Sequence, residues 1–385
     1  MKYFVIYLHI IFMLQSTQIA AQKKLKLPIQ WQVATELPPL ENQIKSLGFA
    51  GPIAGVIKDK LVIAGGANFP DAMPWLGGKK KYYNEVYVYS RKQNQLIQEN
   101  VQFKLSANIA YAASCVTPMG IVYAGGENEN GITNQVHLLQ WDNTSTKLMQ
   151  KSLPSLPTAI TNASMVAIGS DIYFVGGETG NSTSDHFFHL NLTALEHGWD
   201  SMPSIPKPLS HVVLIVQQAG VKQNIFLFGG RAKNKTGISD FSDQSFKFDI
   251  ESKKWERIKP MPYAMSAGSG ITYEDKYVLL FGGDKGTRFN EVEKIISIIE
   301  AEKDVLKKQL DIEKKIELLS THPGFSKEIL RYNIIKNAWE SIGVIPFEAS
   351  VTTTAIQWGN WVIIPSGEIK AGVRTPKITA AKINE

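Results

Sequence analysis

The stretch Leu61-Val62-Ile63-Ala64-Gly65-Gly66 decides the fold, because the chain repeats its pattern of a short apolar run followed by two glycines. Four further copies place their diglycines at 125–126, 176–177, 229–230 and 282–283. Glycine accepts a positive φ and lets backbones approach closely, so each diglycine suits a sharp turn where strands crowd together. A regular spacing of this length indicates a repeat architecture rather than several independent domains.

Each repeat carries signals for four strands. A first apolar stretch precedes the diglycine strand, as at 210–217 and 267–273, and a polar loop follows the glycines. An alternating strand comes next, as at 245–249, and a fourth strand begins at Trp and ends at Pro, as at 199–203, 255–262 and 339–346. Four strands per unit with turn residues between them are typical of a propeller blade. The sequence therefore predicts an all-β, six-bladed β-propeller.

The sixth copy is altered and incomplete. It reads Val362-Ile363-Ile364-Pro365-Ser366-Gly367-Glu368, with serine in place of the first glycine. Its blade shows three strands near the C-terminus, at 350–357, 360–365 and 375–382. The segment 29–33, which contains Trp31 and precedes prolines, supplies a candidate for the fourth. We expect the N-terminal strand to close the last blade, since pairing the two ends removes exposed sheet edges.

An insertion separates the fifth and sixth copies. From 290 to 319 the chain contains no Gly or Pro and is rich in Glu, Lys, Ile and Leu. The spacing of its apolar residues predicts one or two helices within about 288–325, in blade five. Two interpretations are open: a lid over the axial mouth of the propeller, or a packing helix or partner surface.

Composition and the N-terminus limit the classes of protein. The chain has 385 residues, a net charge of +6 and no dense Lys/Arg patch with interleaved aromatics, which argues against a nucleic-acid partner. The excess of positive charge favours an anionic small substrate. Lys2 followed by an apolar run at 3–14 predicts a signal peptide over 1–21 and a propeller over 22–385. That run is too short for a membrane span, and the lone Cys115 reads as a small buried hydrophobe.

The diglycines with spaced Tyr and Trp resemble those of kelch-repeat propellers. The segment 65–71, the helical insertion, and Ser366-Gly367-Glu368 together with Gly372-Val373-Arg374 resemble the N-acetylneuraminate epimerase (sialic acid mutarotase) family. The blade with Gly-Glu and Arg lies mid-chain in familiar members and last here, so the chain is most similar to the cyclically permuted mutarotase branch. This resemblance implies a periplasmic, cofactor-free isomerase that interconverts α and β anomers of N-acetylneuraminate. It also implies Glu368 as proton acceptor and Arg374 as substrate-binding residue.

The chemistry of ring opening agrees with those two residue types. A base must take the proton of the anomeric hydroxyl while an acid protonates the ring oxygen. A partly desolvated carboxylate suits that exchange because burial raises its pKa, and arginine offers a two-pronged donor to the substrate carboxylate. The alternative for Glu368 is a loop salt bridge to Lys370 or Arg374. Gly-Glu alone does not single out a base, because Glu127 and Glu178 also follow a diglycine.

Further residues after the diglycines are expected at the same mouth. Asn68 and Arg288 are the preferred additional substrate contacts, against the alternatives of a turn-capping Asn and a surface Arg. The remaining candidates are Asp71, Trp75, Glu127, Asn128, Glu178, Arg231 and Asp284. The spacing of the histidines predicts no metal site. The competing function is a non-catalytic kelch propeller that binds a glycan or a protein through this face or through the helices.

Overall fold

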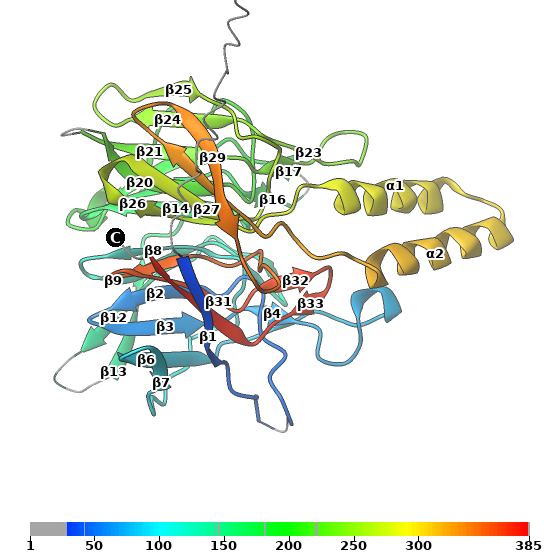
Figure 1. Ribbon diagram of the computed structural model, residues 1–385, viewed down its shortest axis with the longest axis horizontal. Coiled ribbons are helices and arrows are strands. Elements are labelled where there is room, and N and C mark those ends of the chain that lie inside the picture. The colour runs from blue at the N-terminus through cyan, green and yellow to red at the C-terminus, as the bar shows by residue number, and fades with distance from the viewer. Residues whose placement is uncertain are drawn as a thin grey trace, which may run out of the picture.

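The computed structural model describes residues 29–383 except 42, 143, 145, 146, 181, 220 and 221. Its described part forms six four-stranded antiparallel sheets around a common axis, which confirms the predicted six-bladed propeller (Figure 1). In blades one to five the four strands of each sheet follow one another in chain order. The predicted signal peptide at 1–21 lies outside the described residues.

The blades have the following strands, from the innermost outward. Blade one consists of β2 (Ile53–Ile57), β3 (Lys60–Ala64), β6 (Val86–Lys92) and β7 (Gln95–Gln98). Blade two consists of β8 (Ala113–Thr117), β9 (Gly120–Ala124), β12 (Val136–Asp142) and β13 (Lys147–Leu153). Blade three consists of β14 (Ser164–Ile168), β15 (Asp171–Val175), β18 (Phe187–Asn191) and β19 (Asp200–Ser201). Blade four consists of β20 (Val213–Ala219), β21 (Lys222–Phe228), β24 (Ser245–Asp249) and β25 (Lys254–Ile258). Blade five consists of β26 (Ser269–Tyr273), β27 (Tyr277–Phe281), β28 (Glu328–Asn333) and β29 (Ala338–Val344).

Blade six is built from both ends of the described chain. Its order is β30 (Ile356–Trp358), β31 (Trp361–Pro365), β34 (Lys377–Ile383) and β1 (Ile29–Glu36). β1 pairs antiparallel with β34, with Trp31 opposite Ala381, so the predicted closure by the N-terminal strand is confirmed. The predicted first strand at 350–357 is wrong at its start, because Val351 pairs with Glu368 instead and the strand begins at Ile356.

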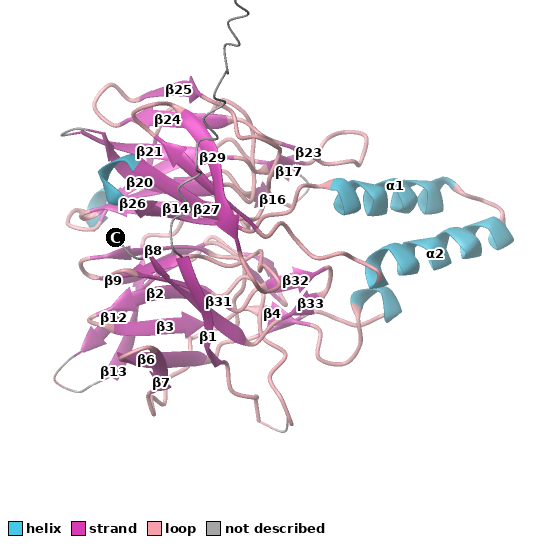
Figure 2. Cartoon of the chain, viewed as in Figure 1, coloured by secondary structure: helices cyan, strands magenta, loops and turns pink. Residues whose placement is uncertain are grey.

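One face of the propeller carries the segments that follow the diglycines. In five blades they form two-stranded ribbons: β4 (Ala67–Asn68) with β5 (Lys81–Tyr82), β10 (Glu127–Asn128) with β11 (Gly131–Ile132), β16 (Glu178–Thr179) with β17 (Ser182–Thr183), β22 (Arg231–Ala232) with β23 (Asp240–Phe241), and β32 (Glu368–Lys370) with β33 (Val373–Arg374). In blade five the hairpin of α1 (Thr287–Ala301) and α2 (Val305–Ser320) takes that place and projects from the disc (Figure 2). Short 3-10 helices lie at Pro74–Leu76, Leu195–His197 and Glu274–Lys276.

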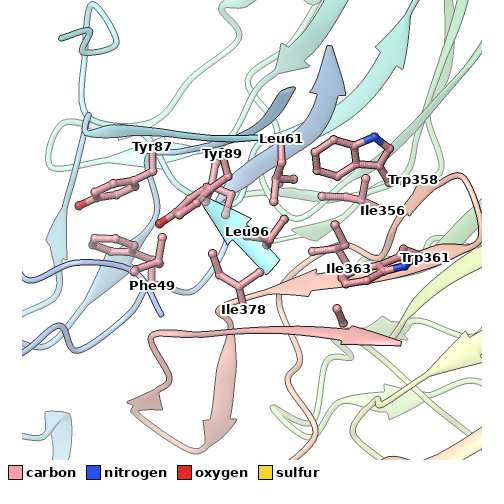
Figure 3. Close-up of a cluster of buried hydrophobic side chains, with 14 of the residues drawn as sticks. Phe49, Leu61, Tyr87, Tyr89, Leu96, Ile356, Trp358, Trp361, Ile363 and Ile378 are labelled. Carbon is pink, nitrogen blue, oxygen red and sulfur yellow. The ribbon is translucent and has the colours of Figure 1, made fainter. Parts of the chain in front are cut away.

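Apolar side chains fill the wedge between each pair of neighbouring blades. The cluster between blades one and six shows the pattern: Tyr87 stacks beside Phe49, and Leu61 lies on the side of Trp358 and Ile356 (Figure 3). Five further clusters occupy the other blade interfaces of the described chain. Fourth-strand tryptophans tie their blade to the preceding one, as when Trp255 Nε1 donates to Pro203 O at 3.0 Å. Burial between blades therefore holds the ring together.

The diglycines turn the chain at the hub. Gly176 and Gly177 have φ of 65° and 97°, and a Cβ on Gly176 would lie 2.2 Å from Leu209 O of the next blade. Only glycine fits such an approach without displacement. Ser366 keeps the same left-handed turn with a φ of 57°. Its hydroxyl accepts the Phe49 N–H at 2.8 Å and lies 3.0 Å from Phe49 O, so polar contacts to blade one take the place of a steric conflict.

Six residues, one from each blade, close a backbone hydrogen-bond ring around the axis, and we call this set the hub ring. Each N–H donates to the carbonyl oxygen of the equivalent residue in the preceding blade, at 2.7 to 3.3 Å. All six have a left-handed φ between 50° and 64°. The members are Gly51, Tyr111, Asn162, His211, Ala267 and Thr352. This ring precedes the inner strand of every blade and holds the six strands in a fixed arrangement around the axis.

Candidate active site

A cavity of about 580 Å³ opens on the face that carries the ribbons and the hairpin, and we call it the axial cavity. Five hub-ring residues contribute to its lining. A smaller cavity of about 150 Å³, lined by all six, lies along the inner strands. The hub ring therefore separates the axial cavity from the remainder of the central channel.

The residue after each second glycine occupies an equivalent place at the wall of the axial cavity. Each forms an isolated backbone bridge with the residue that precedes the hub-ring position, as in Val351 with Glu368. Five of these six positions carry a charge and line the cavity: Glu127, Glu178, Arg231, Asp284 and Glu368. Glu127, Glu178 and Glu368 therefore follow a glycine because they hold the same position in their blades. Only the groups around each carboxylate can distinguish its role.

Glu368 and Arg374 are directly opposite each other in the β32–β33 ribbon. The Glu368 carboxylate accepts the Gly372 N–H at 2.7 Å, and its Oε1 lies 3.7 Å from Arg374 Nη1. The side chain of Glu368 is 18% exposed, so the carboxylate reaches the cavity while the backbone amide fixes its position. This is the arrangement expected of a proton acceptor with an adjacent cation.

Arg374 is buried and only partly paired. Its guanidinium stacks over the Phe69 ring at 4.7 Å, and Nη2 donates to Tyr111 Oη at 3.4 Å. The side chain is 4% exposed, and within the described residues Nε and Nη1 have no hydrogen-bond partner. Leaving buried donors unpaired costs free energy of desolvation, and an anionic ligand group that accepted from them would remove that cost.

A second charged network lies in blades three and four, centred on Glu178. Its carboxylate accepts the Ser210 hydroxyl at 2.9 Å and pairs with Arg231 Nη2 at 3.3 Å and Lys233 Nζ at 3.7 Å. Burial opposes ionisation, but these neighbours hold the pKa of Glu178 below its ordinary value. Burial and the charge of Arg231 lower the pKa of His211, so this histidine is neutral at pH 7.

Two more groups complete the electrostatics. Lys80 Nζ donates to Glu127 at 2.9 Å and lies 4.8 Å from the centre of the Tyr111 ring. Burial opposes the charge, yet Tyr111 and Glu127 raise the pKa of Lys80, so it stays an ammonium. Burial raises the pKa of Asp284, although the N–H of Gly286 acts in the opposite direction.

The structure brings some of the predicted residues together and separates others. Glu368, Arg374 and Arg288 line the axial cavity. Arg288, however, uses Nη1 to donate to Leu318 O at 2.6 Å and pairs with Glu291, so it fastens the two helices at their base. Asn68 is 2% exposed, and its amide is engaged by Gly48 O and the Tyr83 hydroxyl. Its contact with a substrate stays a prediction without geometric support.

The remaining candidates divide in the same way. Glu127, Glu178, Arg231 and Asp284 contribute to the lining, whereas Asp71, Trp75 and Asn128 are not among the lining residues. The sequence interpretation missed Tyr111 and His211, which stand on the hub ring. A signal for both existed: each follows a small residue and stands two positions before an inner strand, as Gly51 and Asn162 also do.

The base of the helical hairpin forms one wall of the axial cavity. Phe289, Val292 and Ile296 of α1 and Leu319 of α2 belong to the lining. Glu293 accepts from the Ser239 backbone N–H and hydroxyl at 2.6 and 2.8 Å, which anchors α1 to blade four. Phe289 also lies under the Arg231 guanidinium at 4.4 Å. The helices therefore shape the site at their base, and their tip projects beyond it.

No group of three or more His, Cys, Asp and Glu side chains is arranged to hold a metal ion in the described part of the chain. Among the described helices, none is both long enough and apolar enough to cross a membrane.

The comparison with protein families is decisive. Residues 153–385 match the family model described as N-acetylneuraminate epimerase. The chain belongs to the N-acetylneuraminate epimerase family. The matched region contains the whole β32–β33 ribbon with Glu368 and Arg374, and the predicted family resemblance is thereby confirmed.

Individual relatives agree with this family assignment. The chain is 25% identical over 235 residues to the N-acetylneuraminate epimerase of Vibrio cholerae, an alignment that covers 58% of each protein. It is 25% identical over 233 residues to that of Haemophilus influenzae, covering 60% of each, and 24% over 251 residues to that of Brucella melitensis, covering 64% of this chain and 63% of the relative. The chain thus matches about three fifths of the length of these epimerase-family relatives.

A solved structure shows the same fold. The structure titled "Structure of YjhT" superposes with a TM-score of 0.61 at 14% sequence identity. The superposition covers 91% of this chain and 100% of the other. The epimerase-family chain and that protein therefore share the propeller architecture over nearly their full lengths.

Proposed function

We propose that this protein is a cofactor-free mutarotase that interconverts the α and β anomers of N-acetylneuraminate or a related sugar acid. One observation carries the proposal: a buried arginine with unpaired donors lies beside a carboxylate that is fixed by a backbone amide. The relatives are named as N-acetylneuraminate epimerases, which supports this class of reaction and substrate. An anionic sugar with a carboxylate at its anomeric carbon fits both side chains at once.

The steps follow from the chemistry of the pair. Arg374 binds the carboxylate of the substrate, which brings the anomeric hydroxyl toward Glu368. Glu368 takes the proton of that hydroxyl as the bond from the anomeric carbon to the ring oxygen breaks, and the ring oxygen is protonated. Rotation presents the other face of the new carbonyl, and ring closure reverses both proton transfers. The surrounding walls limit access of water, which strengthens each charged interaction.

Two finer proposals accompany the reaction. The partial sequence matches contrast with the nearly complete structural superposition, which supports a cyclic permutation of kelch-type blades relative to familiar family members. The apolar run at 3–14 supports secretion into the periplasm by a signal peptide. In this compartment the enzyme would meet free sugar acids released outside the cytoplasm.

The test is an NMR time course of freshly released α-N-acetylneuraminate with and without purified protein. A mutarotase shortens the approach to anomeric equilibrium in proportion to its concentration. An unchanged rate, together with saturable binding of a glycan or a protein, would establish the competing binding function instead.

A further inference from the structure

We propose that Tyr111 is the general acid of this site and donates its phenolic proton to the ring oxygen of the substrate. The inference rests on the proposed mutarotase function and adds the second proton-transfer group that the reaction requires. Tyr111 belongs to the hub ring, and its side chain lines the axial cavity in blade two.

The hydrogen-bond directions leave the phenolic proton available. Arg374 Nη2 donates to Tyr111 Oη at 3.4 Å, so the hydroxyl acts as an acceptor toward the guanidinium. Within the described part of the chain, the Tyr111 hydroxyl donates no hydrogen bond of its own. Burial raises the pKa of this phenol, and the proton is therefore present at neutral pH. A hydroxyl that is held by one partner and still has its proton free is suited to donate to a ligand.

The arrangement of Glu368 and Tyr111 around Arg374 matches the groups that the anomeric carbon of a sugar acid carries. Glu368 Oε1 lies 3.7 Å from Nη1, and Tyr111 Oη lies 3.4 Å from Nη2, so the two side chains are at different nitrogens of one guanidinium. An anomeric carbon of a sugar acid carries a carboxylate, a hydroxyl and the ring oxygen. With the carboxylate on the guanidinium, the hydroxyl and the ring oxygen fall toward the two flanking groups.

The step balances through the tyrosine. As Glu368 removes the hydroxyl proton, the electron pair of the breaking carbon–oxygen bond passes to the ring oxygen, which takes the proton of Tyr111. The phenolate that results lies beside two cations, Arg374 and the Lys80 ammonium 4.8 Å from the ring centre, which stabilise its charge. On closure the phenolate recovers the proton, and protonated Glu368 returns its proton to the new anomeric oxygen.

The neighbouring backbone leaves room for the Tyr111 side chain at the cavity wall. Tyr111 has a φ of 57°, a region that disfavours bulky side chains. The neighbouring hub-ring residue is Gly51, where a Cβ would lie 2.6 Å from the Tyr111 ring. The glycine therefore leaves space for the aromatic ring, and Lys80 lies over the ring. All six hub-ring residues share this backbone conformation, so the φ belongs to the ring, whereas the space that Gly51 leaves is particular to the Tyr111 side chain.

The test compares wild type with Tyr111→Phe, which removes only the hydroxyl, and with Tyr332→Phe as a matched control whose hydroxyl donates to Asn337 in blade five. Anomer exchange is measured by NMR across substrate concentrations, and binding of the unreactive α-methyl glycoside is measured by calorimetry. We expect Tyr111→Phe to lower kcat by about 100-fold, with glycoside affinity and Tm retained and Tyr332→Phe near wild type. An independent arm, Lys80→Met, keeps the phenol and is expected to lower kcat about tenfold by removing charge stabilisation.

The outcomes separate the two levels of the proposal. If wild type exchanges anomers and Tyr111→Phe keeps its kcat, the acid role of Tyr111 is overturned and the mutarotase function stands. A loss of glycoside binding in parallel with kcat would make Tyr111 a structural residue and also overturn the inference. A wild-type protein that leaves the exchange rate unchanged removes both proposals.

Discussion

Arg374 and Glu368 lie opposite each other in one ribbon, with 3.7 Å between Nη1 and Oε1, yet neither satisfies the other. The carboxylate takes its shorter hydrogen bond, 2.7 Å, from the Gly372 N–H. The guanidinium keeps Nε and Nη1 buried and unpaired within the described residues. A simple structural salt bridge would bring the partners to normal hydrogen-bond distance, so this separation favours a site that binds a third group between them.

Glu368→Gln is expected to abolish anomer exchange while leaving the fold intact. The glutamine side-chain oxygen still accepts the Gly372 N–H, but the amide cannot take a proton, so kcat should fall by about 100-fold or more. NMR exchange rates and thermal unfolding measure the two properties. Glu340→Gln is the control, because Glu340 pairs with Arg331 at 2.8 Å across strands of blade five, away from the cavity lining. Equal kcat for Glu368→Gln and wild type would remove Glu368 from the mechanism.

Arg374→Lys is expected to weaken binding of the sugar acid by about 10- to 100-fold, since lysine cannot provide two parallel donors to a carboxylate. Calorimetry with N-acetylneuraminate and its methyl ester separates charge recognition from other contacts. Wild type should prefer the acid strongly, and the variant should lose most of that preference. Arg331→Lys, in the other cross-strand Glu–Arg pair, serves as the control. An unchanged preference for the acid in Arg374→Lys would assign carboxylate binding to another cation, such as Arg231.

The architecture was predictable because it depends on local, repeated chemistry. Diglycines recur in blades one to five, alternating strands recur around the ring, and tryptophans mark the outermost strands of blades three to six. The structure places these features at equivalent positions. The closing strand was also accessible, because Trp31 is equivalent to the tryptophans of complete blades. The predicted starts of two inner strands were a few residues too early. The strands predicted from 210 and 267 begin at Val213 and Ser269, because His211 and Ala267 belong to the hub ring.

The cavity was harder to predict because it depends on contacts between blades. Tyr111 reaches Arg374 across 263 residues of sequence, and no local pattern reports such a pair. Asn68 shows a second limit of local patterns. It is the second residue after the diglycine, one position beyond the equivalent of Glu368, and its amide contacts Gly48 and Tyr83.

His211 is expected to make the protein less stable as the pH falls below about 6.5. Burial and Arg231 lower the pKa of His211 in the folded state. In mildly acidic solution the imidazole therefore binds a proton in the unfolded chain but stays neutral in the folded protein. Stability is then fully present above the ordinary histidine pKa and is lost as the pH falls toward the lower folded value. Glu178, whose pKa is also lowered, adds its own loss only below about 4.5.

Urea unfolding at pH 7.5 and 5.5 measures this linkage. His211→Asn should reduce the loss of unfolding free energy between these values by about 1 kcal/mol. Asparagine is a compatible replacement, because Asn162 occupies the equivalent hub-ring position with the same φ of 55°. His197→Asn is the control, since the His197 side chain is 73% exposed. An identical pH response in wild type and His211→Asn would show that His211 does not titrate differently on folding.

Gly51→Ala is expected to lower both stability and activity, although Gly51 is not among the residues that line the axial cavity. A Cβ at this position would lie 2.5 Å from Tyr111 N and 2.6 Å from its ring, so the hub ring and the Tyr111 side chain must shift. Gly169→Ala is the matched control: its φ of 60° is close to the 64° of Gly51, and no atom lies within 4 Å of the added carbon. Both variants carry the left-handed strain, about 1 kcal/mol, and only Gly51→Ala carries the steric conflict.

We expect Gly169→Ala to keep wild-type kcat with a small fall in Tm, and Gly51→Ala to lower Tm further and kcat by about tenfold. Equal effects of the two substitutions on kcat would show that the position of Tyr111 is not set by its contact with Gly51.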